Sequence, residues 1–131
     1  MAEPTNVVPV RSRSIGDAAV VYASDYLNKL SGEQIERECL RQLDAGIRIL
    51  VINFRDTELV NSIGISILLG VIDAAKSTQA QLIFSDVNDH TVQLFEMLGL
   101  TRHVALAKDE GEVLASLDSL IATNQPPVVS H

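Results

Sequence analysis

The sequence predicts an α/β domain with a mixed, mostly parallel sheet of four to five strands and about four helices, in the order β-β-α-β-α-β-α-(β)-α. Three observations lead to this fold class. The apolar run Ile49–Ile52 has no polar face, which is typical of a strand covered on both sides in a parallel sheet. Strand patterns then alternate with helix patterns, which indicates crossover connections between parallel strands. A turn at Ile15-Gly16-Asp17 separates two strand patterns near the start, so we expect an antiparallel hairpin at one edge.

Two strands and a helix are expected before the central strand. Pro9 places the first strand at a sheet edge, because proline donates no hydrogen bond to a neighbouring strand. Ser31 is the expected N-cap of the first helix, since its hydroxyl can accept a hydrogen bond from a free helix amide. The expected ranges are residues 7–14 and 18–23 for the strands and residues 32–44 for the helix.

The segment after the central strand, Asn53–Asn61, is polar and suits an exposed loop. Asn61 and Ser62 both favour the N-cap position of the helix that follows. The residues from Ile63 to Ala75 are apolar nearly all round, which is typical of a helix packed inside a core, and Ser66 is expected to be buried with them. A membrane span is not expected, because charged residues close this short run.

The last third of the chain predicts two further strands and two helices. Asn88 or Asp89 is the expected N-cap of a short helix, and Gly99 fits its C-terminal stop. The strands are expected at residues 82–84 and 103–106, and the final helix at residues 109–121.

Length and composition favour one domain with an aliphatic core. The chain has 131 residues, of which 47% are hydrophobic and only 4% aromatic. We expect the domain to span residues 5–122, with flexible ends at residues 1–4 and 123–131. The single cysteine, Cys39, excludes an internal disulfide and is expected to be a small core residue.

The charge of the chain argues against some classes of partner. Ten Lys and Arg residues against 17 Asp and Glu residues give a net charge of −7, without a basic stripe. Nucleic-acid binding needs cations that neutralise phosphates, so no nucleic acid is expected as a partner. No signal peptide or transmembrane run is apparent, so we expect a cytoplasmic protein without membrane insertion. The three histidines lack metal-ligand spacing, and no metal site is expected.

Three polar loops, at residues 25–28, 54–61 and 86–89, are expected to follow parallel strands. They should therefore meet at one end of the sheet, where α/β proteins usually place their sites. Any one of these residues suits an ordinary solvated loop, but as a set they form a candidate interface. Its candidate residues are Asp25, Asn28, Asp56, Thr57, Glu58, Asn61, Ser62, Ile63, Gly64, Asp86 and Asn88.

Two segments resemble a known family. The segment VNSIGISILLG (Val60–Gly70) is similar to the signature of STAS domains, the bacterial anti-sigma factor antagonists. That signature is an Asp, a phosphorylatable Ser or Thr, a small residue, a Gly and a large apolar residue at the start of a helix. Ser62 takes the place of the phospho-acceptor and Gly64 that of the glycine. The segment LFEMLGL (Leu94–Leu100) resembles a second family segment, L-F-x-x-x-G-L, and the resemblance extends over about residues 7–120.

The resemblance implies a protein switch. In the family, the unphosphorylated antagonist binds an anti-sigma factor that is also a serine kinase, and thereby releases a sigma factor. Phosphorylation of the serine ends that binding, and a serine phosphatase restores it. For this chain the resemblance implies phosphorylation at Ser62, no catalytic residues and no cofactor, because ATP belongs to the kinase partner.

Some residues depart from the family pattern and leave other interpretations open. Asn61 stands where the family usually has Asp, and Ile63 where a small residue is usual. Residues 25–28 also lack the common Gly-x-Leu-Asp form. One alternative is therefore a STAS scaffold, or a subunit of a signalling or lipid-transport complex. Another alternative, of a different class, is a small enzyme that uses the strand-end loops.

Overall fold

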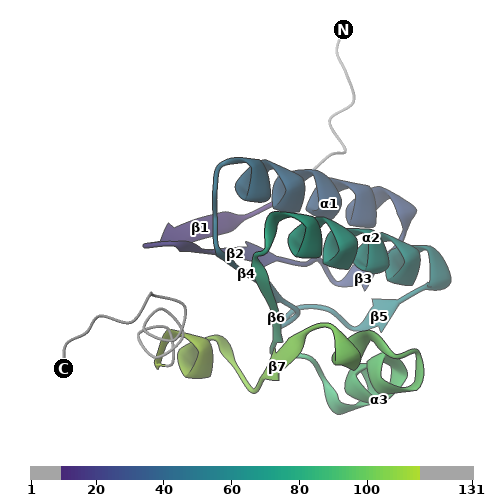
Figure 1. Cartoon of the computed structure of the whole chain (residues 1–131). Coiled ribbons are helices and arrows are strands. Elements are labelled where there is room, and N and C mark those ends of the chain that lie inside the picture. Colours follow the sequence, from purple (N-terminus) through teal and green to yellow (C-terminus); the bar gives the residue numbers. More distant parts are fainter. Residues whose placement is uncertain (1–9, 116–131) are drawn as a thin grey trace, which may run out of the picture.

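Five strands form one mixed sheet in the spatial order β1-β2-β4-β6-β7 (Figure 1). In this computed structural model, which describes residues 10–115, β2, β4, β6 and β7 are parallel, and β1 pairs antiparallel with β2. The predicted mostly parallel sheet with a hairpin at its edge is therefore confirmed. The strands span Ser12–Ile15 (β1), Ala18–Tyr22 (β2), Ile49–Asn53 (β4), Gln81–Ser85 (β6) and Ala105–Ala107 (β7).

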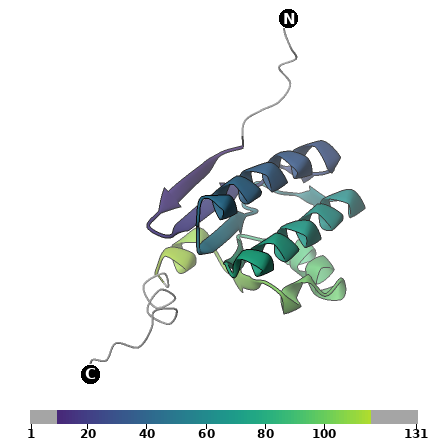
Figure 2. The same ribbon diagram turned by 45° about the horizontal axis from the view of Figure 1, so that its top comes forward.

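Helices connect these strands and cover both faces of the sheet. The helices are α1 (Lys29–Asp44), α2 (Ser62–Thr78) and α3 (Asp89–Met97), followed by the short 3-10 helix η1 (Leu100–Arg102). Residues 110–115 are also helical. Both views show α1 and α2 side by side over the sheet (Figures 1 and 2). Among residues 10–115, no helix is long and apolar enough to cross a membrane.

The central strand β4 supplies both halves of the core. Leu50 and Ile52 pack into the larger cluster with α1 and α2, whereas Ile49 and Val51 pack on the opposite face with Val113. Successive side chains of a strand point to opposite faces, so coverage of both faces leaves no residue of β4 exposed. The structure thus confirms the burial on both faces that the unbroken apolar run Ile49–Ile52 predicts.

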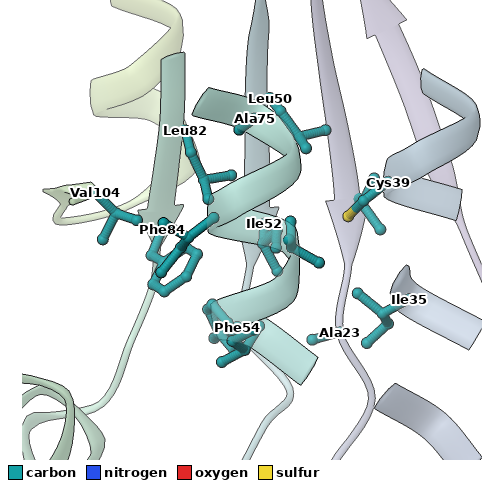
Figure 3. Close-up of a cluster of buried hydrophobic side chains, with 14 of the residues drawn as sticks. Ala23, Ile35, Cys39, Leu50, Ile52, Phe54, Ala75, Leu82, Phe84 and Val104 are labelled. Carbon is teal, nitrogen blue, oxygen red and sulfur yellow. The ribbon is translucent and has the colours of Figure 1, made fainter. Parts of the chain in front are cut away.

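The three phenylalanines of the chain pack together at the end of the sheet where the loops lie. The ring centroids are 5.1 Å apart for Phe54 and Phe84, 5.7 Å for Phe54 and Phe95, and 5.5 Å for Phe84 and Phe95. All three side chains are fully buried, and Figure 3 shows Phe54 and Phe84 in the larger cluster. Edge-to-face aromatic contacts of this kind stabilise a core beyond their buried area, so they fix α3 against the loop after β4.

Cys39 is buried on α1 in the same cluster, which confirms its predicted place in the core (Figure 3). Its burial raises the pKa of the thiol, because the thiolate form would lose its hydration. Such a thiol is inert toward oxidants compared with an exposed cysteine.

The N-cap of α1 differs from the predicted one. The Oδ1 atom of Asn28 accepts a hydrogen bond from the Ser31 amide at 3.1 Å, and the Ser31 hydroxyl accepts one from the Asn28 amide at 3.0 Å. This reciprocal pair is a capping box, with Asn28 as the extended cap residue. The prediction of Ser31 as N-cap is therefore wrong, and α1 begins three residues earlier than expected.

Helix α2 is not covered all round, contrary to the sequence-based expectation. Ile63 is 46% exposed and Leu69 is 42% exposed, and Ser66 is exposed as well. The sheet and α1 take up the other sides of the helix, whose buried residues are Gly64, Ile65, Leu68, Val71, Ile72 and Ala75. One face of α2, beginning at its first residue, therefore remains open to a partner.

The predicted ends of the domain fall partly outside residues 10–115. Strand β1 lies at the sheet edge as predicted but begins at Ser12, and residues 7–9 of the expected strand lie outside the described residues. The final helix is seen over residues 110–115, and the rest of its expected range lies outside them. The same holds for the ends expected to be flexible.

Candidate functional site

The first two strand-end loops are joined to each other by a separate two-stranded sheet. Strand β3 (Tyr26–Leu27) pairs in parallel with β5 (Leu59–Val60). Beside this pair, the Glu58 amide donates a hydrogen bond to the Asp25 carbonyl at 2.7 Å. The sequence predicts that the loops meet but does not reveal β3 and β5, since two residues are too few to show a strand period.

Thr57 links all three loops from a buried position. Its hydroxyl donates a hydrogen bond to the Ser24 carbonyl at 2.6 Å, and its own carbonyl accepts one from the Asn88 side-chain amide at 3.3 Å. Only 5% of Thr57 is exposed, so its side chain supports the loops from within, and its contact with a partner stays a prediction. The exposed loop residues among the candidates are Asp25, Asp56, Glu58 and Asn88.

The N-terminus of α2 is capped by Asn61. The Oδ1 atom of Asn61 accepts a hydrogen bond from the Gly64 amide at 2.8 Å, and the Asn61 backbone is extended as an N-cap requires. Ser62 is the first residue of the helix and is exposed. Within residues 10–115 its hydroxyl has no hydrogen-bond partner, so it is free to react or to bind.

Gly64, in the first turn of α2, leaves room for close contact between this helix and β3 because it has no side chain. A Cβ atom at this position would come within 2.5 Å of the Leu27 carbonyl oxygen, which is closer than real contacts allow. That oxygen accepts a hydrogen bond from the Asn61 amide at 3.0 Å. Gly64 thus lets α2 approach β3 from a buried position, and its contact with a partner stays a prediction.

Two further candidates are partly buried. Asn28 is half-buried and caps α1. Asp86 is also half-buried and has a left-handed backbone with φ of 60°, a conformation that costs energy for a residue other than glycine. Its Oδ2 atom is buried without a hydrogen-bond partner in the described part of the chain. Asp86 therefore turns the chain after β6, and its contact with a partner stays a prediction.

Exposed apolar side chains lie on the elements next to the start of α2. Leu59 is 60% exposed and Tyr26 is 42% exposed, and they come from the paired strands β5 and β3. Together with Ile63 they form an apolar surface, which we call the Ser62 surface. A cavity of about 200 Å³ is lined by Asp56 and by residues of β2 and α1, but by neither Ser62 nor Ile63. The free hydroxyl therefore lies on open surface, which suits contact with a protein better than enclosure of a small molecule.

Residues 10–113 match the family model of the STAS domain. This chain belongs to the STAS domain family. The match covers most of the chain and includes every candidate site residue.

Several relatives share this fold or sequence. BtrV of Bordetella bronchiseptica, described as an anti-sigma factor antagonist, is 27% identical over 73 residues. That match spans 56% of this chain and 63% of BtrV. An anti-sigma factor antagonist from Mycobacterium paratuberculosis has a similar crystal structure, with a TM-score of 0.72 at 16% identity, over 83% of this chain and 92% of that one.

The antagonist SpoIIAA in its unphosphorylated form is also similar, with a TM-score of 0.67 at 14% identity. The likeness covers 86% of this chain and 97% of that one. The phosphorylated form of SpoIIAA from Bacillus has the same TM-score of 0.67, at 17% identity over 82% of this chain and 98% of that one. At these identities the solved structures establish the fold of this STAS domain, and its activity is a separate question.

Proposed function

We propose that this STAS domain is an anti-sigma factor antagonist that binds an anti-sigma factor with serine kinase activity. The main support for the proposal is the free hydroxyl of Ser62 at the exposed start of α2. This hydroxyl is free because the side chain of Asn61, not that of Ser62, caps the helix. The description of BtrV as an antagonist and the two phosphorylation forms of SpoIIAA support it.

The Ser62 surface and its surroundings favour a particular kind of partner. Tyr26, Leu59 and Ile63 offer apolar area, which contributes binding energy when it is removed from water. The loops beside it expose three carboxylates, those of Asp25, Asp56 and Glu58. A partner with an apolar recess and a basic rim would complement both features, and the opposite charges would speed its association.

Phosphorylation of Ser62 would switch this binding without unfolding the domain. A phosphate adds roughly −1.5 to −2 charges. At a helix N-terminus the free amides and the helix dipole favour such a charge by about 0.3–1 kcal/mol. In an interface the same charge and bulk clash with a partner selected to fit a neutral hydroxyl, at a cost of several kcal/mol. Since every ~1.4 kcal/mol changes affinity tenfold, one phosphate is sufficient to end binding.

The departure of Asn61 from the family Asp is compatible with this switch. Asn61 caps α2 through Oδ1 as an aspartate would, and its Nδ2 atom lies 3.4 Å from the Tyr26 hydroxyl. An amide brings no negative charge next to Ser62, so it does not repel a phosphate there. A serine phosphatase that removes the phosphate completes the proposed cycle.

Incubation with the cognate kinase and ATP, followed by mapping of the product by mass spectrometry, tests the acceptor. We expect phosphate on Ser62 of the wild type and no phosphate on Ser62→Ala. The Ser66→Ala variant should be phosphorylated on Ser62 to the same extent as the wild type. Ser66 is a matched control because it is an exposed serine one helical turn further along α2. Modification elsewhere, or none in the wild type, would reject Ser62 as the acceptor.

Capture of the partner tests the switch itself. The wild type and Ser62→Ala are expected to retain the anti-sigma factor, and Ser62→Asp is expected to lose it. Equal recovery by all three proteins would remove Ser62 from the switch and favour a scaffold role instead.

A further inference from the structure

A carboxylate from the opposite face of the sheet reaches the end of β4. Glu110 begins the helical segment 110–115, which packs through Val113 on the face away from α1 and α2. Its Oε1 atom accepts two hydrogen bonds, from Asn53 Nδ2 at 2.9 Å and from the Tyr22 hydroxyl at 2.9 Å. Its Oε2 atom pairs with Arg13 Nη2 at 2.6 Å and also lies 3.1 Å from the Tyr22 hydroxyl. Asn53 thus contacts Oε1 and Arg13 contacts Oε2, whereas the Tyr22 hydroxyl is within hydrogen-bond distance of both oxygens.

Both partners of the Oε1 atom go on to contact Arg55. The Asn53 side-chain carbonyl accepts a hydrogen bond from the Arg55 amide at 2.7 Å. The Tyr22 ring lies beneath the Arg55 guanidinium, with 5.6 Å from Cζ to the ring centroid, a distance at which the ring attracts the cation. Arg55 is thus held at its backbone and at its side chain by two groups that Glu110 orients.

Asn53 has little freedom without this carboxylate. It is 1% exposed, so an amide that lost its acceptor would be left buried and unpaired. A half-turn of the side-chain amide would exchange its donor and acceptor ends and break the bond to Arg55. The acceptor oxygen of Glu110 selects the orientation in which Nδ2 faces Oε1 and Oδ1 faces the loop.

We infer that Glu110 is a positioning residue for the loop Arg55–Glu58, acting through Asn53 and Tyr22. This loop carries Asp56 and Glu58, and it leads directly into Leu59 of the Ser62 surface. One consequence rests on the proposed function: through Glu110, the helical segment 110–115 would affect how tightly the partner binds. The positioning itself is a property of the free domain.

Amide hydrogen exchange measured by NMR separates positioning from simple attachment of the segment. In Glu110→Gln the side-chain oxygen can still accept from Asn53 and Tyr22, while the ion pair with Arg13 is lost. Arg13→Ala removes only that ion pair and is the matched control. Glu110→Ala removes all these contacts, and Asn53→Ala removes the link from its other end.

We expect the Arg55 amide to exchange about tenfold faster or more in Glu110→Ala and in Asn53→Ala, because Asn53→Ala removes its acceptor and Glu110→Ala frees Asn53 to turn away from it. In Glu110→Gln and Arg13→Ala the exchange of this amide should stay within about twofold of the wild type, since neither loses the Oε1 contacts. Unchanged exchange in Glu110→Ala, or equal loosening in Arg13→Ala, would overturn the inference. If Glu110→Ala does not fold, Glu110→Leu, which also lacks an acceptor but keeps apolar bulk, takes its place with the same expected and contrary results.

Calorimetric titration with the cognate anti-sigma factor tests the consequence. Glu110→Ala should bind the partner more weakly than the wild type by about tenfold, with Glu110→Gln and Arg13→Ala close to the wild type. Unchanged affinity in Glu110→Ala, despite a loosened loop, would overturn control of the partner site. If the wild type itself fails to bind, the proposed function fails, and the exchange measurement still decides the positioning.

Discussion

The Asn61 side chain accepts a hydrogen bond from the Gly64 amide at 2.8 Å, and this bond leaves the hydroxyl of the intervening Ser62 free. Two adjacent residues that both favour the N-cap position thus have different tasks. Asn61 caps the N-terminus of α2, and Ser62 stays available at the exposed start of the helix. The division allows the site to change chemically without loss of the helix.

Removal of the cap should cost more stability than removal of the candidate phospho-acceptor. Asn61→Ala is expected to lower the free energy of unfolding by about 1 kcal/mol, because one helix amide loses its acceptor. Ser62→Ala should stay within about 0.5 kcal/mol of the wild type, since its hydroxyl is unbonded at the surface. Urea denaturation of the two variants measures this difference. A larger loss of stability in Ser62→Ala than in Asn61→Ala would show that Asn61 is not the residue that caps α2.

The two glycines of α2 should respond differently to the same substitution. Gly64→Ala places a methyl group 2.5 Å from the Leu27 carbonyl oxygen, and the resulting shift should cost about 1–3 kcal/mol. At Gly70 the nearest atom is Glu36 Oε2 at 3.3 Å, the end of a flexible side chain. Gly70→Ala should therefore be neutral or stabilising by up to about 1 kcal/mol, because alanine favours a helix more than glycine does. Thermal unfolding of both variants tests the contrast, and equal effects would contradict the close approach of α2 to β3.

The buried hydroxyl of Thr57 should matter for stability. Thr57→Val keeps the shape of the side chain but loses the hydrogen bond to the Ser24 carbonyl, with an expected cost of about 1–3 kcal/mol because that partly buried carbonyl loses its donor. Thr57→Ser keeps the donor and should cost less. Chemical denaturation distinguishes them. A more stable Thr57→Val would show that the loops do not depend on this bond.

Acid should weaken the domain partly through Glu38 of α1. Hydrogen bonding from Arg41, together with bonds from Gln42 and Ser12, lowers the pKa of the Glu38 carboxyl from 4.5 to about 2. A carboxylate with a lowered pKa in the folded state contributes stability above its unfolded pKa and loses it as pH falls through the folded value. The stability that Glu38 adds should therefore be complete above about pH 5 and decline toward pH 2.

Urea denaturation of the wild type and Glu38→Gln from pH 6 to pH 2 measures this contribution. The advantage of the wild type is expected to shrink as the pH falls, because glutamine does not titrate. A constant difference across the range would show that the ionised carboxylate is not preferred in the folded state.

The sequence predicts those features of the fold that have a local cause. The run Ile49–Ile52 shows by itself that a strand is covered on both faces, and the structure confirms it. The local preference of the side chains predicts Asn88 or Asp89 as N-cap of α3, and the structure has Asn88 there. The meeting of the loops follows from the parallel order of the strands before them.

Features that depend on distant residues could not be predicted. An apolar helix pattern does not tell which face a neighbour will cover, so the exposure of Ile63 and Leu69 appears only in the structure. Thr57 is buried because its hydroxyl meets Ser24, which is 33 residues earlier in the chain. Glu110 contacts Asn53 across 57 residues, and no spacing in the sequence indicates that contact.

The affinity of one partner for two forms of the chain tests the central claim most directly. Calorimetric titration should compare the unmodified domain with the domain phosphorylated at Ser62, each against the cognate anti-sigma factor. The account predicts clear binding by the unmodified form and a loss of about a hundredfold or more on phosphorylation, which corresponds to the several kcal/mol of a charge clash in an interface. Equal affinity of the two forms would contradict it.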